Sequence, residues 1–166
     1  MIDTKDTDIY VQAAYVAQKT SGLLCMKRKH PIIFTQCLCN EAMAESIIPL
    51  HVLTGCDHNS SFYGAGKTLI ADRVKKSPEA QQFLTSCGTQ LPITDEIIGD
   101  LEKFIIKYVY NDHRSKTLGQ ARAGKWRSLK RKSTTRLPPT QIACVHITFR
   151  RIILYNTTRL QSALDE

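Results

Sequence analysis

The sequence predicts an α-rich α/β fold with few short strands, and three observations lead to this expectation. Most of the chain divides into segments of helical length with their apolar residues spaced for one helix face. Only two short apolar runs, 23–26 and 31–34, have the length of buried strands. A chain of 166 residues with 42% apolar residues is also long enough to bury a core of its own.

The first third of the chain is expected to form a helix, strands and a second helix. Residues 8–19 predict a helix that Ser21 and Gly22 end. The two apolar runs flank a basic turn, which indicates either a β-hairpin or two strands of a larger sheet. Residues 40–54 are rich in Ala, Ile and Leu and predict a helix that is interrupted near Pro49.

The rest of the chain is expected to be helical. Helices are predicted at 67–76 and 78–86, and Ser-Pro-Glu at 77–79 is a typical helix start. Residues 94–110 predict an amphipathic helix whose apolar face serves as core or as a partner surface. That face carries Ile97, Leu101, Phe104, Ile105 and Tyr108. The sequence Leu-Pro-Pro-Thr at 137–140 ends any preceding helix and starts another at about 140–155.

A glycine-rich turn at 64–67 follows an acidic residue, Asp57, which closes an apolar run. The Gly-Lys-Thr at 66–68 matches the end of a nucleotide-binding P-loop, but that motif requires glycine where the chain has Ser61. Tyr63 would also place a bulky ring inside a loop that must wrap phosphates. The P-loop interpretation is therefore the weaker one.

A hairpin between two helices explains the glycines of this turn better, because glycine accepts positive φ. Successive amides at the start of the following helix would then attract an anion. Nearby positive charge comes from Lys67, Arg73, Lys75 and Lys76. An ordinary glycine turn before a solvated helix remains the alternative.

The pattern LTGCD-x-x-S-x-F-x-G-x-G-K at 53–67 resembles the helix–two-turn–helix region of flap endonucleases and related PIN-like 5′-nucleases. The resemblance implies that Asp57 ligates a metal and that Gly64, Gly66 and Lys67 hold a substrate phosphate. The sequence at 4–8, Thr-Lys-Asp-Thr-Asp, resembles the Asp-x-Asp element of that family. The whole chain resembles a group of transposon-associated animal proteins with the motifs DTD…LTGCD…GxGK…LPPT, over about residues 4–150.

The resemblance implies a magnesium site formed by Asp6, Asp8 and Asp57. Magnesium prefers carboxylate oxygens and keeps several waters, and two-metal nucleases use such ions to activate water and stabilise the leaving oxygen. Taken without the resemblance, Asp3, Asp6 and Asp8 are more simply explained as an acidic helix cap at a frayed terminus. The family takes further carboxylates from segments before its Asp-x-Asp element. We therefore expect the C-terminal part of a nuclease domain that is inactive alone. A fragmentary gene model, a truncated transposon relic and one half of a composite protein, whose other half a larger polypeptide supplies, are the alternatives.

Positive charge is concentrated between residues 114 and 136, where nine of the 23 Lys and Arg residues and none of the 15 acidic residues lie. Such a segment is typical of contact with the phosphates of DNA or RNA. Trp126 within it could stack on an unpaired base. A solvated basic loop or a nuclear-localisation signal is the alternative. The candidate nucleic-acid contacts are Arg122, Lys125, Trp126, Arg127, Lys130, Arg131 and Lys132.

The composition also predicts a location. No apolar run reaches the ~18 residues of a membrane span, and the N-terminus is not a secretory signal. Six cysteines without a Cys-x-x-Cys pair indicate reduced thiols in an intracellular protein. The basic segment further predicts that this protein is nuclear. A zinc site combining Cys37 and Cys39 with His30 or His51 has poor spacing, and buried or idle cysteines explain these residues better.

Together these features predict two regions. Residues 1–90 would be the C-terminal part of a PIN-like nuclease domain, with the helix–two-turn–helix at 53–76, and residues 91–166 a helical extension carrying the basic segment. The predicted function is nucleic-acid binding by a protein derived from a magnesium-dependent, flap-type nuclease. The alternatives are an active nuclease subunit or fragment of a longer nuclease, and a non-catalytic protein-interaction domain.

Overall fold

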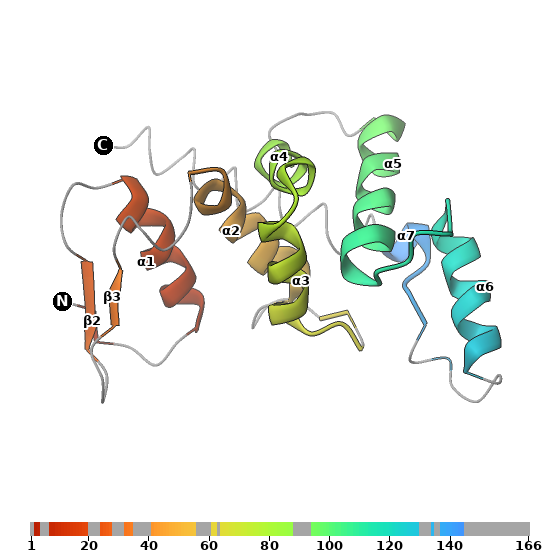
Figure 1. The fold of residues 1–166 in the computed structure, drawn as a ribbon, viewed down its shortest axis with the longest axis horizontal. Coiled ribbons are helices and arrows are strands. Elements are labelled where there is room, and N and C mark those ends of the chain that lie inside the picture. The colour runs from red at the N-terminus through yellow and green to blue at the C-terminus, as the bar shows by residue number, and fades with distance from the viewer. Residues whose placement is uncertain are drawn as a thin grey trace.

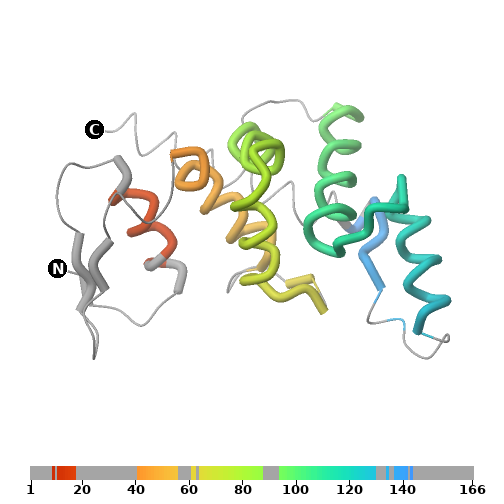
Figure 2. The backbone as a smooth tube through the Cα atoms, viewed as in Figure 1, coloured from red at the N-terminus to blue at the C-terminus, as the bar shows by residue number. Residues whose placement is uncertain are grey.

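The structure is a computed structural model that describes residues 2–3, 7–19, 24–27, 32–34, 41–55, 61–62, 64–87, 94–129, 134 and 137–144. Its described part is rich in helix, as the sequence predicted. The helices follow one another in a row from α1 to α6, with the strands beside α1 and α7 beside α5 and α6 (Figure 1 and Figure 2). The helices are α1 (Thr7–Lys19), α2 (Glu41–Thr54), α3 (Lys67–Lys75), α4 (Pro78–Ser86), α5 (Asp95–Phe104), the π-helix η2 (Ile105–Val109), α6 (Leu118–Ser128) and α7 (Gln141–Cys144).

A small sheet of three short strands accompanies α1. Strand β2 (Leu24–Lys27) pairs antiparallel with β3 (Ile32–Phe34), with Cys25 opposite Ile33, so the strands expected from the two apolar runs are confirmed. Strand β1 (Ile2–Asp3) pairs in parallel with β2. Strand β1 was not predicted from the sequence, because two residues are too few to show an alternating pattern.

Helix α2 runs through Pro49, so the expected interruption of this helix is wrong. Proline removes one backbone hydrogen bond and crowds the preceding turn, at a cost of about 3 kcal/mol in an isolated helix. Here Pro49 is buried, and α2 packs against α1, α3 and α4. Burial of the helix on several sides offsets the local cost, so the helix continues to Thr54.

The core extends from α2 to α6. Its most deeply buried large side chains come from α3, α4, α5, η2 and α6, namely Ile70, Leu84, Leu101, Ile105 and Leu118. The apolar face predicted for 94–110 is core, since its members are buried except for Ile97, which is partly buried and packs against the cluster. One core thus contains residues from both sides of the boundary that was expected between residues 90 and 91. The division of the chain into two regions stays a prediction.

The segment after α5 departs from a regular helix. Ile105–Val109 form a π-helix, and the Tyr110 amide donates to the Ile105 carbonyl across five residues at 3.0 Å. The wider turn lets two adjacent apolar pairs face the core, with Ile105, Ile106, Tyr108 and Val109 all buried. Lys107 between the two pairs stays accessible and forms an ion pair on the surface.

Cys87, at the end of α4, is a buried thiol that is 3% exposed. Burial raises the pKa of this thiol to about 12, so almost no thiolate is present near neutral pH. We expect iodoacetamide at pH 8 to leave Cys87 unmodified in the folded chain and to modify it in guanidinium. Peptide mass spectrometry measures this, and rapid alkylation of Cys87 in the folded chain would show that it is not buried.

Candidate nucleic-acid interface

Gly55, the residue that follows α2, lies close to Ser61. Gly55 has φ of 105°, a conformation that favours glycine. A Cβ atom at Gly55 would lie 2.8 Å from the Cα of Ser61, so the chain returns to the end of α2. Residues 56–60, which include Asp57, lie outside the described residues. The glycine of the Leu-Thr-Gly-Cys-Asp motif therefore has a backbone role.

The turn that follows is anchored to the core by Phe62. The ring of Phe62 meets Tyr110 edge-on, with 6.1 Å between ring centroids, and Ala65 also packs against the core. The Ala65 amide donates to the Phe62 carbonyl at 3.2 Å, and Gly64 has φ of 75°, as the third residue of a type II turn does. Gly66 has φ of −71°, so only Gly64 of these two glycines uses positive φ.

Helix α3 begins after this turn with a glycine as its N-cap residue. Gly66 has no side chain and therefore forms no side-chain cap hydrogen bond with the first turn of α3. Lys67 and Thr68 are exposed at this end. Uncapped amides and the positive end of the helix dipole favour a negatively charged group here. The exposed Lys67 adds a mobile positive charge to the same place.

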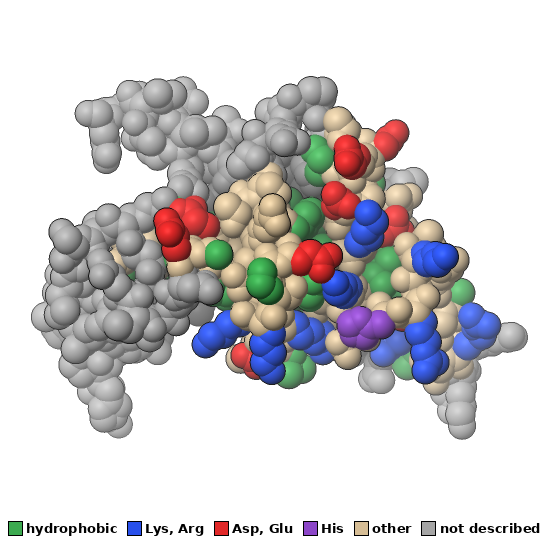
Figure 3. Space-filling model, turned by 45° about the horizontal axis from the view of Figure 1, so that its top comes forward, with side chains coloured by type: hydrophobic (Ala, Val, Ile, Leu, Met, Phe, Trp, Pro, Cys, Tyr) green, Lys and Arg blue, Asp and Glu red, His purple; other side chains and the backbone are tan. Residues whose placement is uncertain are grey.

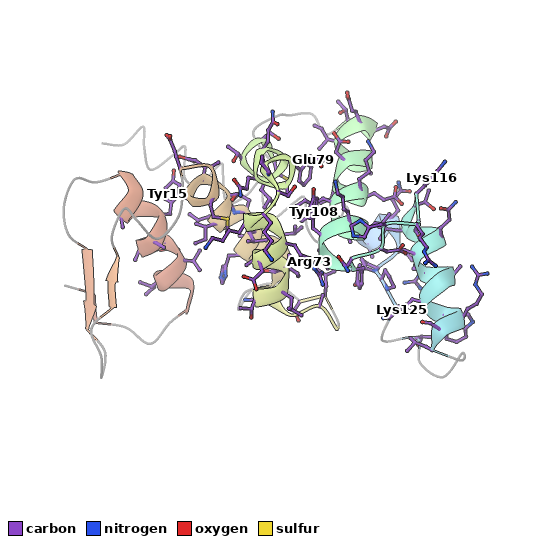
Figure 4. The ribbon with its side chains drawn as sticks, viewed as in Figure 1. Tyr15, Arg73, Glu79, Tyr108, Lys116 and Lys125 are labelled. Carbon is purple, nitrogen blue, oxygen red and sulfur yellow. The ribbon has the colours of Figure 1, made fainter. Side chains whose placement is uncertain are left out.

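Arg73 does not belong to the exposed charge of α3, contrary to the expectation from the sequence. Its Nη1 donates to the carbonyl oxygens of Tyr108 at 2.8 Å and of Val109 at 2.9 Å. Arg73 therefore binds the last turn of η2 and lies between α3 and α5 (Figure 4). Lys75 and Lys76 are exposed and remain available to a partner.

Helix α6 carries three basic residues of the predicted segment, Arg122, Lys125 and Arg127. Lys125 and Arg127 are exposed, whereas Arg122 is half-buried and its Nη1 donates to the carbonyl of Pro138. Trp126 is half-buried and lines a shallow cavity of about 280 Å³ with Arg122, Ala123, Thr134 and Leu137. Lys130, Arg131 and Lys132 lie outside the described residues. Arg122 is thus a structural residue as well as a candidate contact.

Charges on the described surface are partly separated by sign. Many Lys and Arg side chains lie along one edge, over α3 and α6, and most Asp and Glu side chains lie away from it (Figure 3). Helix α3 also carries one exposed carboxylate, Asp72. Among the described residues, ion pairs join Lys103 to Asp100 and Lys107 to Glu79. We define the basic edge by its exposed cations, which form no ion pair with a described carboxylate: Lys67, Lys75, Lys76, Arg114, Lys116, Lys125 and Arg127.

The described part of the structure does not include the side chains of the three predicted magnesium ligands. Asp6 and Asp57 lie outside the described residues, and Asp8 is the second residue of α1, where only the backbone is described. Elsewhere in the described ranges, no three His, Cys, Asp or Glu side chains form a group that could hold a metal. The magnesium site stays a prediction. In the same part of the chain, no helix is long and apolar enough to span a bilayer.

A groove between α4 and α5–η2 was not predicted from the sequence. Its cavities of about 300 and 550 Å³ share Glu79, Lys103 and Lys107. The carboxylate of Glu79 accepts from Lys107 at 2.7 Å and from the Tyr108 hydroxyl at 3.2 Å. These bonds lower the pKa of Glu79, and the bond to Glu79 raises the pKa of Lys107. No local pattern shows that residues 28 positions apart will pair.

Comparison of the chain with protein-family models, with curated proteins and with solved structures gave no match.

Proposed function

We propose that this chain binds nucleic acid through the basic edge. The observation that carries the proposal is the gathering over α3 and α6 of exposed cations that form no ion pair with a described carboxylate (Figure 3). Exposed Lys and Arg side chains displace the cations condensed on the phosphates of a nucleic acid, so binding releases ions and is favoured by entropy. The uncapped start of α3 adds backbone amides that can donate to a phosphate oxygen.

This mode of binding contacts phosphates and depends little on base sequence. If about five phosphates are neutralised, the logarithm of the association constant should fall with the logarithm of salt concentration with a slope of about −3.5 for a single strand and about −4.5 for a duplex. Trp126 borders a shallow cavity on α6 and offers a ring on which an unpaired base can stack. We therefore expect single-stranded DNA or RNA to bind at least as well as a duplex.

We expect Lys67→Ala to weaken binding of a labelled single strand and to make the salt slope shallower by about 1, because one phosphate contact is lost. Fluorescence anisotropy at several salt concentrations measures both quantities. Lys67→Arg is the matched control, since it keeps a positive charge at the same exposed position at the start of α3. An unchanged slope in Lys67→Ala, or an equal loss in Lys67→Arg, would remove the charge of Lys67 from the interface.

We further propose that the scaffold derives from a magnesium-dependent, flap-type nuclease. The motif residues Gly55 and Gly64 both have the positive φ that a tight connection between helices uses. Asp8 follows a strand and stands in the first turn of a helix, which is compatible with the Asp-x-Asp element of the family. A bound magnesium ion would stabilise charge on the attacking or leaving oxygen.

Magnesium titration followed by NMR tests the metal site. We expect saturable shifts of the amides near Asp6, Asp8 and Asp57, and we expect Asp57→Asn to abolish them because one carboxylate ligand is lost. Calcium and potassium chloride at matched ionic strength are the controls. Absence of shifts, or shifts that persist in the Asp57 variant, would contradict the magnesium site without affecting binding through the basic edge.

A further inference from the structure

The groove between α4 and α5–η2 has an aromatic floor. Phe83 stacks on Phe104 with 5.1 Å between ring centroids and an angle of 28°, and Phe104 lies 5.1 Å from Tyr108. Phe104 is buried, whereas Phe83 is half-buried and lines the cavity of about 300 Å³. The row of rings therefore ends at Phe83 beside an open space. A planar group of suitable size can extend the row by stacking there.

The rim of this cavity contains both donors and acceptors of hydrogen bonds. The lysines at 103 and 107 and the carboxylates at 79 and 100 line it, together with Gln82 and Ser86. The two ion pairs on the rim are largely solvated, since the Lys103 and Glu79 side chains are 74% and 75% exposed. Exposed pairs contribute little to stability, so a ligand can replace either partner at small cost.

The second cavity, of about 550 Å³, continues from the same lysines towards the loop before α6. It is lined by His113 and Lys116, which can donate to an anion, and by Ser115 and Asp112. The Asp112 carboxylate already accepts from the Ser115 hydroxyl at 2.7 Å and from the Arg114 amide at 2.9 Å. The groove thus combines a stacking surface, a mixed polar rim and a cationic end, and both cavities have the size of small-molecule sites.

We propose that this groove binds one unpaired nucleotide. The base stacks on Phe83, its edge bonds to the carboxylates and lysines of the rim, and its phosphate lies towards Lys107, Lys116 and His113. An apolar peptide side chain would use the rings and leave the polar rim unsatisfied, whereas a base uses both. If the nucleotide is part of a strand, the inference rests on the proposed binding of nucleic acid by this chain. A free nucleotide has the same base and phosphate and would make the same contacts.

The experiment uses the full chain and two kinds of probe. Guanosine monophosphate and inorganic phosphate are titrated separately and followed by NMR. A single strand with all its bases, and the same strand with one abasic position, are compared by anisotropy. We expect guanosine monophosphate, but not phosphate alone, to shift amides of residues 79–86 and 100–107. The abasic strand should bind about 5- to 100-fold more weakly when the missing base is the one that stacks.

Phe83→Leu tests the stacking surface, and Phe83→Tyr is its matched control. Phe83 is half-buried, stacks on Phe104 and lines the groove, and tyrosine keeps the aromatic ring at this position. We expect Phe83→Leu to weaken binding of the strand about 5- to 100-fold with an unchanged salt slope, and Phe83→Tyr to leave affinity as it is. If Phe83→Leu does not fold, the abasic strand and the nucleotide titration still test binding in the groove, because both measurements use the unaltered chain.

The outcomes separate the groove from the basic edge. Binding of the strand without nucleotide shifts in the groove, and without an effect of the abasic position or of Phe83→Leu, would overturn the groove and leave the proposed function standing. Nucleotide shifts in the groove without any binding of the strand would remove the proposed function and establish a site for a free nucleotide. Equal shifts with inorganic phosphate would contradict stacking, because phosphate has no ring.

Discussion

Gly55→Ala is expected to lower the free energy of unfolding by about 3 kcal/mol, the sum of a strained backbone and a steric clash. With φ of 105°, Gly55 has a conformation that an alanine adopts only with strain. The new Cβ would also lie 2.8 to 2.9 Å from backbone and side-chain atoms of Ser61. Because Ser61 begins the segment leading to the turn before α3, relief of this clash would move the turn itself.

Two glycines of the same loop serve as controls. Gly64 has φ of 75° but open space around its Cβ position, so Gly64→Ala should cost about 1 kcal/mol from strain alone. Gly66 has negative φ and open space, so Gly66→Ala should cost about 0.5 kcal/mol as a poorer N-cap. Urea unfolding followed by circular dichroism measures the three values. Equal losses at Gly55 and Gly64 would show that the approach of Ser61 contributes nothing.

Helix starts and the core face could be predicted from the sequence because their causes are local. Ser77 precedes a proline and its hydroxyl accepts from the Ala80 amide, and Thr94 likewise accepts from the Ile97 amide. The exception is Pro49, whose local cost is offset by packing against elements far away in the chain. The π-helix at Ile105–Val109 also depends on packing, since its sequence fits a regular helix equally well.

The candidate site was predicted less well, because residues of one chemical type differ in their distant partners. Lys67 and Arg73 are both basic residues of α3, yet one is exposed and the other binds carbonyls of η2, 35 residues away. Arg122 and Lys125 differ in the same way on α6, since Arg122 binds Pro138. Charge along the sequence therefore predicts an electrostatic surface, whereas the fold decides which of its members a ligand can contact.

Arg73→Met is the second change expected to have a large effect, and it distinguishes structural from exposed cations. The guanidinium donates to two carbonyls at the C-terminal end of η2, where helical carbonyls lack partners. Charged donors contribute about 1.5–3 kcal/mol per hydrogen bond, and a cation also interacts favourably with this end of the helix dipole. Methionine keeps the apolar length of the side chain and removes both bonds, so we expect a loss of about 3 kcal/mol.

Lys75→Met is the matched control, because Lys75 lies on the same helix and is exposed. The control should keep its stability within about 0.5 kcal/mol, as surface substitutions do, while its binding of a single strand weakens and its salt slope becomes shallower by about 1. Arg73→Met should show the reverse, with a melting temperature lower by about 6–12 °C and an unchanged salt slope below the transition. A shallower slope in the Arg73 variant with undiminished stability would mean that its guanidinium contacts phosphate and does not bind η2.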